Sequence, residues 1–161
     1  MLEANNAFNS THNHQHCVSD ALKHAKSLCK SQGQRLTPIR ELVLRLVWQS
    51  HKPLGAYELL PRLAEAGFNS APPTVYRALD FLQELGLIHR ISSMNAFIGC
   101  TQPDHPHPTA FMICRTCRTA AELDTTALEV LFNSSANNQG FRIEQQSVEL
   151  LGLCHSCQES N

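Results

Sequence analysis

Long hydrophobic runs are missing from this chain. No stretch of its 161 residues approaches the roughly 20 apolar residues that a membrane span needs. The predominantly polar segment 1–17 has neither the basic start nor the apolar centre of a secretory signal. We therefore expect a cytoplasmic protein without membrane contact. In a reducing compartment, its seven cysteines favour metal binding over disulfides.

A strong charge of one sign is also missing, because the formal net charge is −1. The two halves differ, however. Residues 1–90 carry 10 Lys/Arg against 7 Asp/Glu, whereas residues 91–161 carry 3 against 7. The pattern indicates a weakly basic first half and an acidic second half, although two differently decorated surfaces would account for it equally well.

Apolar residues recur at three- and four-residue steps in the first half. This periodicity predicts helices over 18–32, from Pro38 to about 50, over 56–66 and over 75–85. Two short β-like runs follow, over 87–91 and 96–100. This order is typical of a winged helix-turn-helix, whose fourth helix would enter the major groove and whose hairpin is the wing. A plain helical subdomain with a hairpin would have the same order.

Particular side chains refine these expectations. Cys29 lies on the apolar stripe of the first helix, so we expect a buried thiol. Arg77 falls on the outer face of the fourth helix. In the third helix, the candidates for burial are Tyr57, Leu60, Leu63 and Ala64. Pro61 predicts a bend there or a later start, because an interior proline removes a backbone hydrogen bond.

The second half has a different organisation. Residues 101–109 contain three prolines and resemble a hinge linker. The patterns beyond it predict strands over 110–114 and 119–123, a helix over 125–137 and a strand over 141–151. The predicted fold is therefore α+β. A disordered tail over 1–17 precedes a winged-helix domain over 18–100, and a small α/β domain follows over 110–161.

Two Cys-x-x-Cys pairs provide the strongest chemical signal. Cys114 and Cys117 form the first pair, and Cys154 and Cys157 form the second. Four thiolates on two tight turns are typical of a closed, structural zinc site. A redox dithiol is the competing interpretation, but a thioredoxin-like site needs one such motif at the start of a helix, and here there are two.

A second set of metal-binding residue types surrounds the linker. It consists of His89, Cys100, His105, His107 and Glu122. Each residue alone is more typical of an ordinary structural position, yet imidazole, thiolate and carboxylate together make a plausible four-ligand zinc shell. His12, His14, His16 and Cys17 of the tail would bind metal only weakly.

Four segments resemble those of a known family. They are the run Pro-Pro-Thr-Val-Tyr-Arg-Ala-Leu-Asp-Phe-Leu over 72–82, the preceding Arg-Leu-Thr-Pro-x-Arg over 35–40, and the two cysteine pairs. Over about residues 20–158, the chain resembles the ferric-uptake-regulator family, and within it the zinc uptake regulator branch. The resemblance implies a homodimeric, zinc-responsive transcription factor that binds a double-stranded DNA operator through a winged helix and dimerises through its α/β domain.

The resemblance also implies roles for individual residues. The structural zinc falls on Cys114, Cys117, Cys154 and Cys157, and the regulatory zinc falls on His89, Cys100, His107 and Glu122, which gives two zinc ions per protomer. His105 replaces His107 if the loop shifts, because that loop looks short. The DNA-contacting candidates are Tyr57, Thr74, Tyr76 and Arg77. Pro61 departs from the polar residue expected at its position, which affects local helix geometry and any contact between dimers there.

The resulting hypothesis is a repressor of zinc-uptake genes that is active with zinc bound, and not an enzyme with a small-molecule substrate. An iron or peroxide sensor of the same family is one alternative, and a zinc-stapled interaction module without a DNA role is another. A zinc deaminase is excluded by its motif, which needs His-x-Glu ahead of Pro-Cys-x-x-Cys. Here Pro108 and Thr109 follow His107, and Ile113 precedes Cys114.

Overall fold

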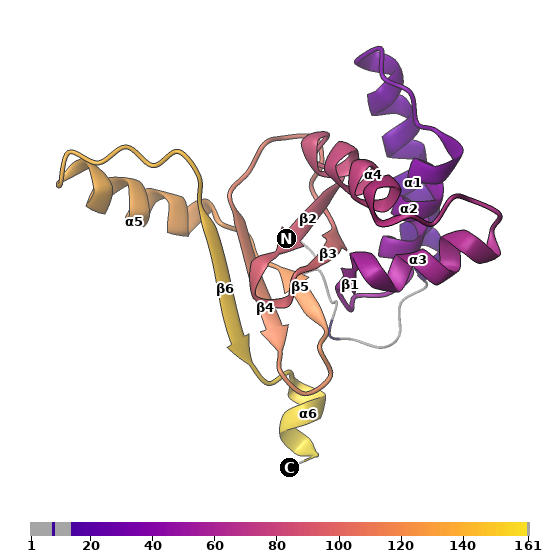
Figure 1. Ribbon diagram of the computed structural model, residues 1–161. Helices are drawn as coiled ribbons and strands as arrows, with labels where there is room; N and C mark the ends of the chain where they lie inside the picture. Colours follow the sequence, from indigo (N-terminus) through magenta and orange to yellow (C-terminus); the bar gives the residue numbers. More distant parts are fainter. Residues whose placement is uncertain (1–7, 9–13, 161) are drawn as a thin grey trace.

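Four helices build the first half of the molecule. The computed structural model describes residue 8 and residues 14–160, in which these helices are α1 (His14–Ser31), α2 (Pro38–Trp48), α3 (Ala56–Glu65) and α4 (Pro72–Glu84). Their apolar stripes meet in one core (Figure 1) that contains Cys29, Val43, Leu59 and Leu79. The predicted burial of the Cys29 thiol is therefore confirmed.

The predicted tail ends earlier than expected. Helix α1 begins at His14, so the interpretation of 14–17 as disordered is wrong. The His14 ring lies 4.9 Å from the His51 ring, a contact that no sequence pattern indicates. Residues 1–7 and 9–13, including His12 of the predicted weak metal tract, lie outside the described residues.

The prediction for α3 was correct in extent, and of the four residues expected to be buried it was correct for Leu63 and wrong for Tyr57. The helix begins at Ala56 and runs through Pro61, so it does not start late. It buries Ala56, Leu59 and Leu63, whereas Tyr57 is 67% exposed. Pro61 is exposed, so its ring takes no space from the core.

The wing is a three-stranded sheet in the order β1-β3-β2. Strands β2 (Ile88–Ile91) and β3 (Ala96–Gly99) form the predicted antiparallel hairpin, and β1 (Leu54–Gly55) adds two residues to the other edge of β3. A single 3-10 turn, η1 (Ser92–Met94), connects the hairpin, and Asn95 closes it with a left-handed φ of 46°.

The second half contains the predicted small sheet, in the order β5-β4-β6. Strand β4 (Thr109–Cys114) is antiparallel to β5 (Ala120–Glu122) and parallel to β6 (Ser147–Gly152). Helix α5 (Thr126–Asn137) projects away from the rest of the chain (Figure 1). The predicted strand over 141–151 was too long, because only its end pairs with β4, and the short helix α6 (His155–Glu159) was not predicted.

Strand β3 joins two separate cores, and this fixes the wing between the halves. Phe97 belongs to the core of the helices, whereas Ile98 packs with Ile91 and with Phe111 and Ile113 of the second sheet. A side chain at Gly99 would collide with the Trp48 indole ring, so α2 lies directly on the strand at this point. Among the residues with described positions, no helix is both long and apolar enough to cross a bilayer.

Candidate metal centre and nucleic-acid interface

Strand alternation orients the metal-binding residue types around the linker. His89 pairs with Ile98 across the wing hairpin, so both side chains lie on the face toward the second sheet. Cys100 follows Ile98 by two residues and shares that face. On the second sheet, Glu122 pairs with Phe111, whose side chain packs against the wing. The two sheets therefore present thiolate, imidazole and carboxylate groups to each other.

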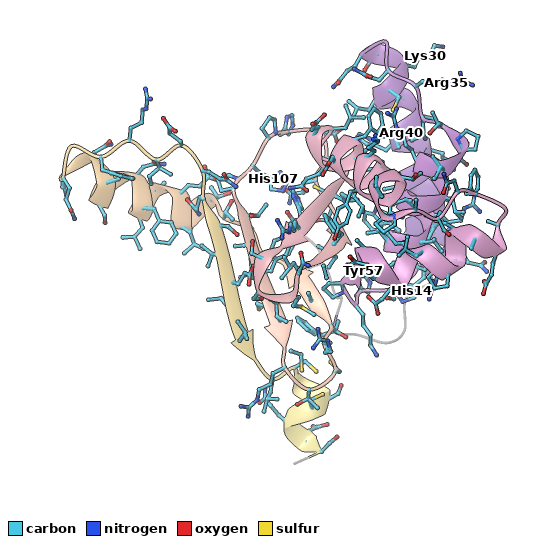
Figure 2. All side chains as sticks on the ribbon, in the orientation of Figure 1. His14, Lys30, Arg35, Arg40, Tyr57 and His107 are labelled. Atoms are coloured by element: carbon cyan, nitrogen blue, oxygen red, sulfur yellow. The ribbon has the colours of Figure 1, made fainter. Side chains whose placement is uncertain are left out.

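The ligand-type atoms of His89, Cys100, His107 and Glu122 all lie within 4.8 Å of one another. Nε2 of His107 is 2.5 Å from Oε1 of Glu122, and Nε2 of His89 is 3.2 Å from the same oxygen. Sγ of Cys100 is 3.8 Å from Nε2 of His107. Figure 2 labels His107 beside the second sheet, on the side toward the wing. The structure thus brings together residues that are 33 positions apart in the sequence.

Neighbouring groups orient these side chains. Nδ1 of His107 donates a hydrogen bond to the carbonyl oxygen of His105 at 2.8 Å, which leaves Nε2 directed into the cluster. The backbone amide and hydroxyl of Thr101 donate to Oε2 of Glu122 at 3.2 and 2.9 Å. His105 therefore contributes its carbonyl group, and its own ring lies outside the cluster, where His107 takes the place.

Burial and charge set the protonation of the cluster. Burial, followed by the negative charge of Glu122, raises the pKa of the Cys100 thiol to about 12. Burial would also raise the pKa of Glu122, but hydrogen bonds and charge from His89 and His107 outweigh it and lower that pKa to about 2. Burial opposes a charged His107, yet its hydrogen bonds to His105 and Glu122 raise its pKa overall.

This donor set suits a zinc ion. Two imidazoles, one thiolate and one carboxylate form a four-ligand shell, and the sulfur makes it softer than a shell of histidines and carboxylates alone. Nε2 of His89 is buried and faces Oε1 of Glu122 at 3.2 Å, without a hydrogen bond of ideal geometry. A bound cation would give this buried nitrogen a better partner.

The four cysteines form the other cluster. The Sγ atoms of Cys114, Cys117, Cys154 and Cys157 also lie within 4.8 Å of one another. Because β4 and β6 are parallel and end at Cys114 and Gly152, both cysteine turns leave the sheet at the same edge. Backbone amides of Cys154 and Cys117 lower the pKa of Cys114 to about 6, which favours its thiolate. Four thiol ligands leave no open position, as in a structural site.

The candidate DNA-contacting residues lie on α3 and α4. Tyr57 is 67% exposed near the start of α3, and Tyr76 and Arg77 are exposed on α4, whereas Thr74 is partly buried. Val75, Ala78, Leu79 and Leu82 hold α4 in the core and turn Arg77 outward. Figure 2 shows Lys30 and Arg35 at the end of the helical half away from Tyr57, so this end carries basic side chains.

Sequence reasoning missed two polar contacts between the halves. Thr101, which holds Glu122, follows Cys100 in a loop without a periodic pattern. Glu149 accepts hydrogen bonds from the backbone of the wing turn, at Ser92 and Ser93. A signal for Glu149 did exist, since it is a single carboxylate inside the otherwise apolar run Val-Glu-Leu-Leu over 148–151.

Comparisons with known proteins agree with this architecture. Residues 31–151 match the model of the ferric uptake regulator family. The chain is 38% identical over 143 residues to the zinc uptake regulation protein of Escherichia coli (strain K12), which covers 88% of this chain and 84% of that protein. It superposes with a TM-score of 0.84 on a zinc uptake regulator complexed with zinc and DNA, at 38% identity over 89% of this chain and 96% of the other.

A third relative has been solved in two forms. The chain superposes on holo XcZur with a TM-score of 0.78, at 42% identity over 86% of this chain and 96% of that one. On apo XcZur the TM-score is 0.51, at 40% identity over 88% of this chain and 97% of that one. The arrangement described above is thus much closer to the holo form than to the apo form.

Proposed function

Because the chain belongs to the ferric uptake regulator family, we propose that it is a zinc-responsive, DNA-binding transcriptional regulator that represses zinc-uptake genes when zinc is bound. One observation carries this proposal. The donor atoms of His89, Cys100, His107 and Glu122 converge between the wing and the second sheet, where a cation would join the two halves. The similarity to zinc uptake regulators supports zinc as that cation.

Two zinc ions would bind each protomer. Cys114, Cys117, Cys154 and Cys157 would hold a permanent ion that staples the second sheet. His89, Cys100, His107 and Glu122, which we call the hinge cluster, would hold the regulatory ion. When bound, that zinc would neutralise the converging donors and tie the wing to the second sheet. In the domain division proposed above, the linker 101–109 separates the winged-helix domain from the α/β domain. His89 and Cys100 of the hinge cluster then belong to the first domain, His107 to the linker and Glu122 to the second domain.

DNA would contact the exposed face of α4. Arg77, which is exposed on α4, would make a base-edge or phosphate contact, and Thr74 and Tyr76 of the same helix and the exposed Tyr57 of α3 would add further contacts. Lys23, Lys26 and Arg35 would meet phosphates, so the affinity for DNA would fall with salt. In a two-fold dimer, the orientation of the wing domain on the second sheet decides whether both α4 helices reach successive major grooves, about 34–36 Å apart.

The dimer would form through the second half. Helix α5 buries none of its residues in the single chain, and Val130 and Leu131 are 71% and 59% exposed. Leu150 and Leu151 are also exposed on the edge strand β6. A second copy that covers these side chains would remove apolar surface from water and give the operator-binding form its two-fold symmetry.

The test is DNA binding against buffered free zinc. A duplex would be enriched from random-sequence DNA with zinc-loaded protein, and its binding followed by fluorescence anisotropy while zinc per protomer is counted. We expect two zinc ions, of which one resists chelators, and DNA affinity that rises with free zinc by about 100-fold or more. If ferrous iron restores binding where zinc does not, the iron-sensing alternative replaces the proposal.

Two substitutions separate the roles of metal and DNA contacts. Cys100→Ser should abolish most of the zinc dependence, with Cys17→Ser as the thiol control outside both clusters. Arg77→Ala should weaken DNA binding by about 10-fold or more without changing zinc content, with Arg142→Ala as the charge control on the second half. Zinc dependence that survives in Cys100→Ser would contradict sensing by the hinge cluster. Unchanged DNA affinity in Arg77→Ala would favour the interaction-module alternative.

A further inference from the structure

A carboxylate of the second sheet holds the tip of the wing. Oε1 of Glu149, on β6, accepts hydrogen bonds from the backbone amides of Ser92 at 2.7 Å and Ser93 at 3.3 Å, and Oε2 accepts from Ser93 at 3.2 Å. The partners are more than 50 residues apart in the sequence and belong to opposite halves of the molecule. These hydrogen bonds join the two halves through protein groups alone.

The wing turn supplies amides that lack local acceptors. Ser92 begins the single 3-10 turn η1, and the first amides of such a turn have no partner within it. An ionised carboxylate at this end satisfies them with charge-assisted hydrogen bonds, which are stronger than neutral ones. Glu149 therefore acts as an N-terminal cap for η1 that is provided by another sheet.

The register of the second sheet relates Glu149 to the hinge cluster. Phe111 of β4 pairs with Glu122 on one side and with Glu149 on the other. These three residues form one row across the sheet, and Phe111 at its centre packs in the cluster with Ile91 and Ile98 of the wing. The two carboxylates thus hold the wing at two points, Glu122 near His89 and Glu149 at the turn that begins three residues later.

We propose that Glu149 is a positioning residue for the hinge cluster: it latches the wing onto the second sheet and so keeps His89 and Cys100 assembled opposite His107 and Glu122. The inference rests on the proposed function and goes beyond it, because it assigns part of the zinc affinity to a residue that binds no metal. When the form of the protein that can bind a ligand becomes less populated, the apparent affinity for the ligand falls by the same factor. Loss of the latch would therefore weaken zinc binding at the hinge.

The test compares Glu149→Ala and Glu149→Gln with the wild-type protein and with Glu144→Ala. Glu144 is an exposed carboxylate of the same half whose ion pair is with Arg142, so it controls for charge. Zinc affinity of the hinge cluster would be measured by chelator competition. We expect binding at least about 10-fold weaker for Glu149→Ala, since losing even one charge-assisted hydrogen bond has that effect, and a partial rescue by Gln, whose carbonyl oxygen can still accept.

The wing provides a second arm. Ser92→Pro deletes the amide donor, and the extended conformation of Ile91 before it (φ −94°, ψ 109°) is compatible with a following proline. We expect the effects of Ser92→Pro and Glu149→Ala to be less than additive, because both remove the same contact. Hinge zinc affinity within twofold of wild type in Glu149→Ala, or full additivity in the double variant, would overturn the latch.

Failure of the latch and failure of the proposed function remain distinguishable. Hydrogen exchange of the Ser92 and Ser93 amides can be measured in zinc-free protein, so it depends on neither zinc nor DNA. It should be faster in Glu149→Ala than in Glu144→Ala. If the wild-type protein shows this protection but no zinc-dependent DNA binding, the proposed function is wrong and the contact stands. Equal exchange in both variants would refute the contact whatever the protein binds.

Discussion

Cys100 faces two opposing demands at the residue scale. As a metal ligand it must be a thiolate, yet burial and the adjacent Glu122 raise its pKa to about 12 and keep the thiol protonated at neutral pH. The pKa of His107 is also raised, in part by its hydrogen bond to Glu122, which favours the protonated ring in the metal-free protein. A cation at the hinge cluster must therefore displace protons, so metal affinity and pH are coupled.

This coupling gives a pH prediction. Zinc affinity of the hinge cluster should rise by about 10-fold per pH unit near neutrality, since the Cys100 proton is lost on binding, and more steeply at lower pH where His107 is also protonated. Chelator competition at several pH values and constant ionic strength measures the slope. Cys100→Ser, which has no thiol proton to lose, should show a shallower slope. An affinity independent of pH would contradict this protonation scheme.

The pKa of Glu122 is shifted in the opposite direction from those of Cys100 and His107. Its pKa is lowered from 4.5 to about 2, so it binds a proton more readily in the unfolded chain than in the folded one. The stabilisation that follows is fully present above pH 4.5 and is lost as the pH falls toward about 2. Acid should therefore weaken the metal-free hinge, while Glu122 remains ionised and ready to bind a cation throughout the neutral range.

Several of these residues could be oriented from the sequence. Period-two alternation places His89 and Cys100 on the faces that the structure shows, once the hairpin over 87–100 is predicted. The choice of His107 over His105 depended on a loop with three prolines, for which alternation makes no prediction. Glu149 was missed for a different reason: its place in an apolar run marks it as unusual, but its partners are backbone amides, which no side-chain pattern identifies.

At the scale of elements, the parallel pairing of β4 with β6 organises the second half. Arg115, just beyond β4, donates its amide to the carbonyl oxygen of Gly152 at 2.9 Å, and the Cys154 amide donates to Sγ of Cys114 at 3.4 Å. The cysteine turns thus continue the pairing of β4 with β6 beyond its six paired residues. Parallel pairs of this length need cover or staples to persist.

Loss of the four-cysteine site should therefore unfold the second half selectively. Cys154→Ser is expected to lower its Tm by about 10 °C or more, because a structural zinc ion contributes directly to folding free energy. Thermal unfolding followed by circular dichroism should then show two transitions, with the helical half melting as before. Cys17→Ser is the control. A single unchanged transition in Cys154→Ser would show that the cluster does not stabilise this sheet.

Element prediction succeeded where periodicity was long and failed where elements were short. The four helices and the wing hairpin have the predicted order and nearly the predicted bounds. Strand β1, with two residues, and helix α6, with five, are too short for a period to appear. In α3 the predicted stripe included the buried Leu63 but also the exposed Tyr57 and missed Leu59, because both satisfy helical spacing.

At the scale of the whole molecule, the single chain leaves apolar surface on its second half. Helix α5 stands away from the other elements (Figure 1) and exposes Val130 and Leu131. Strand β6 forms an edge of its sheet and exposes Leu150 and Leu151. An uncovered apolar helix beside an open edge is unstable in water and indicates burial against another chain.

Leu131→Asp should weaken the proposed dimer by about 100-fold, because it would bury an unpaired charge in the interface. Sedimentation velocity at micromolar concentration should then detect monomers, and affinity for the enriched duplex should fall with dimer content. Asn133→Asp adds the same charge about 200° further round α5 and should remain dimeric. If Leu131→Asp is dimeric as well, α5 is not part of the interface.

Two features of the protein were predicted correctly from the sequence by itself. The α+β class and the cysteine turns follow from periodicity and spacing, which are local properties of the chain. The relation between the halves was decided only by the tertiary structure, because strand β3 is buried on both faces and packs into two cores at once. That packing brings His89 and Glu122 together and places Glu149 on the wing tip, since contacts between distant residues depend on how sheets stack rather than on any period.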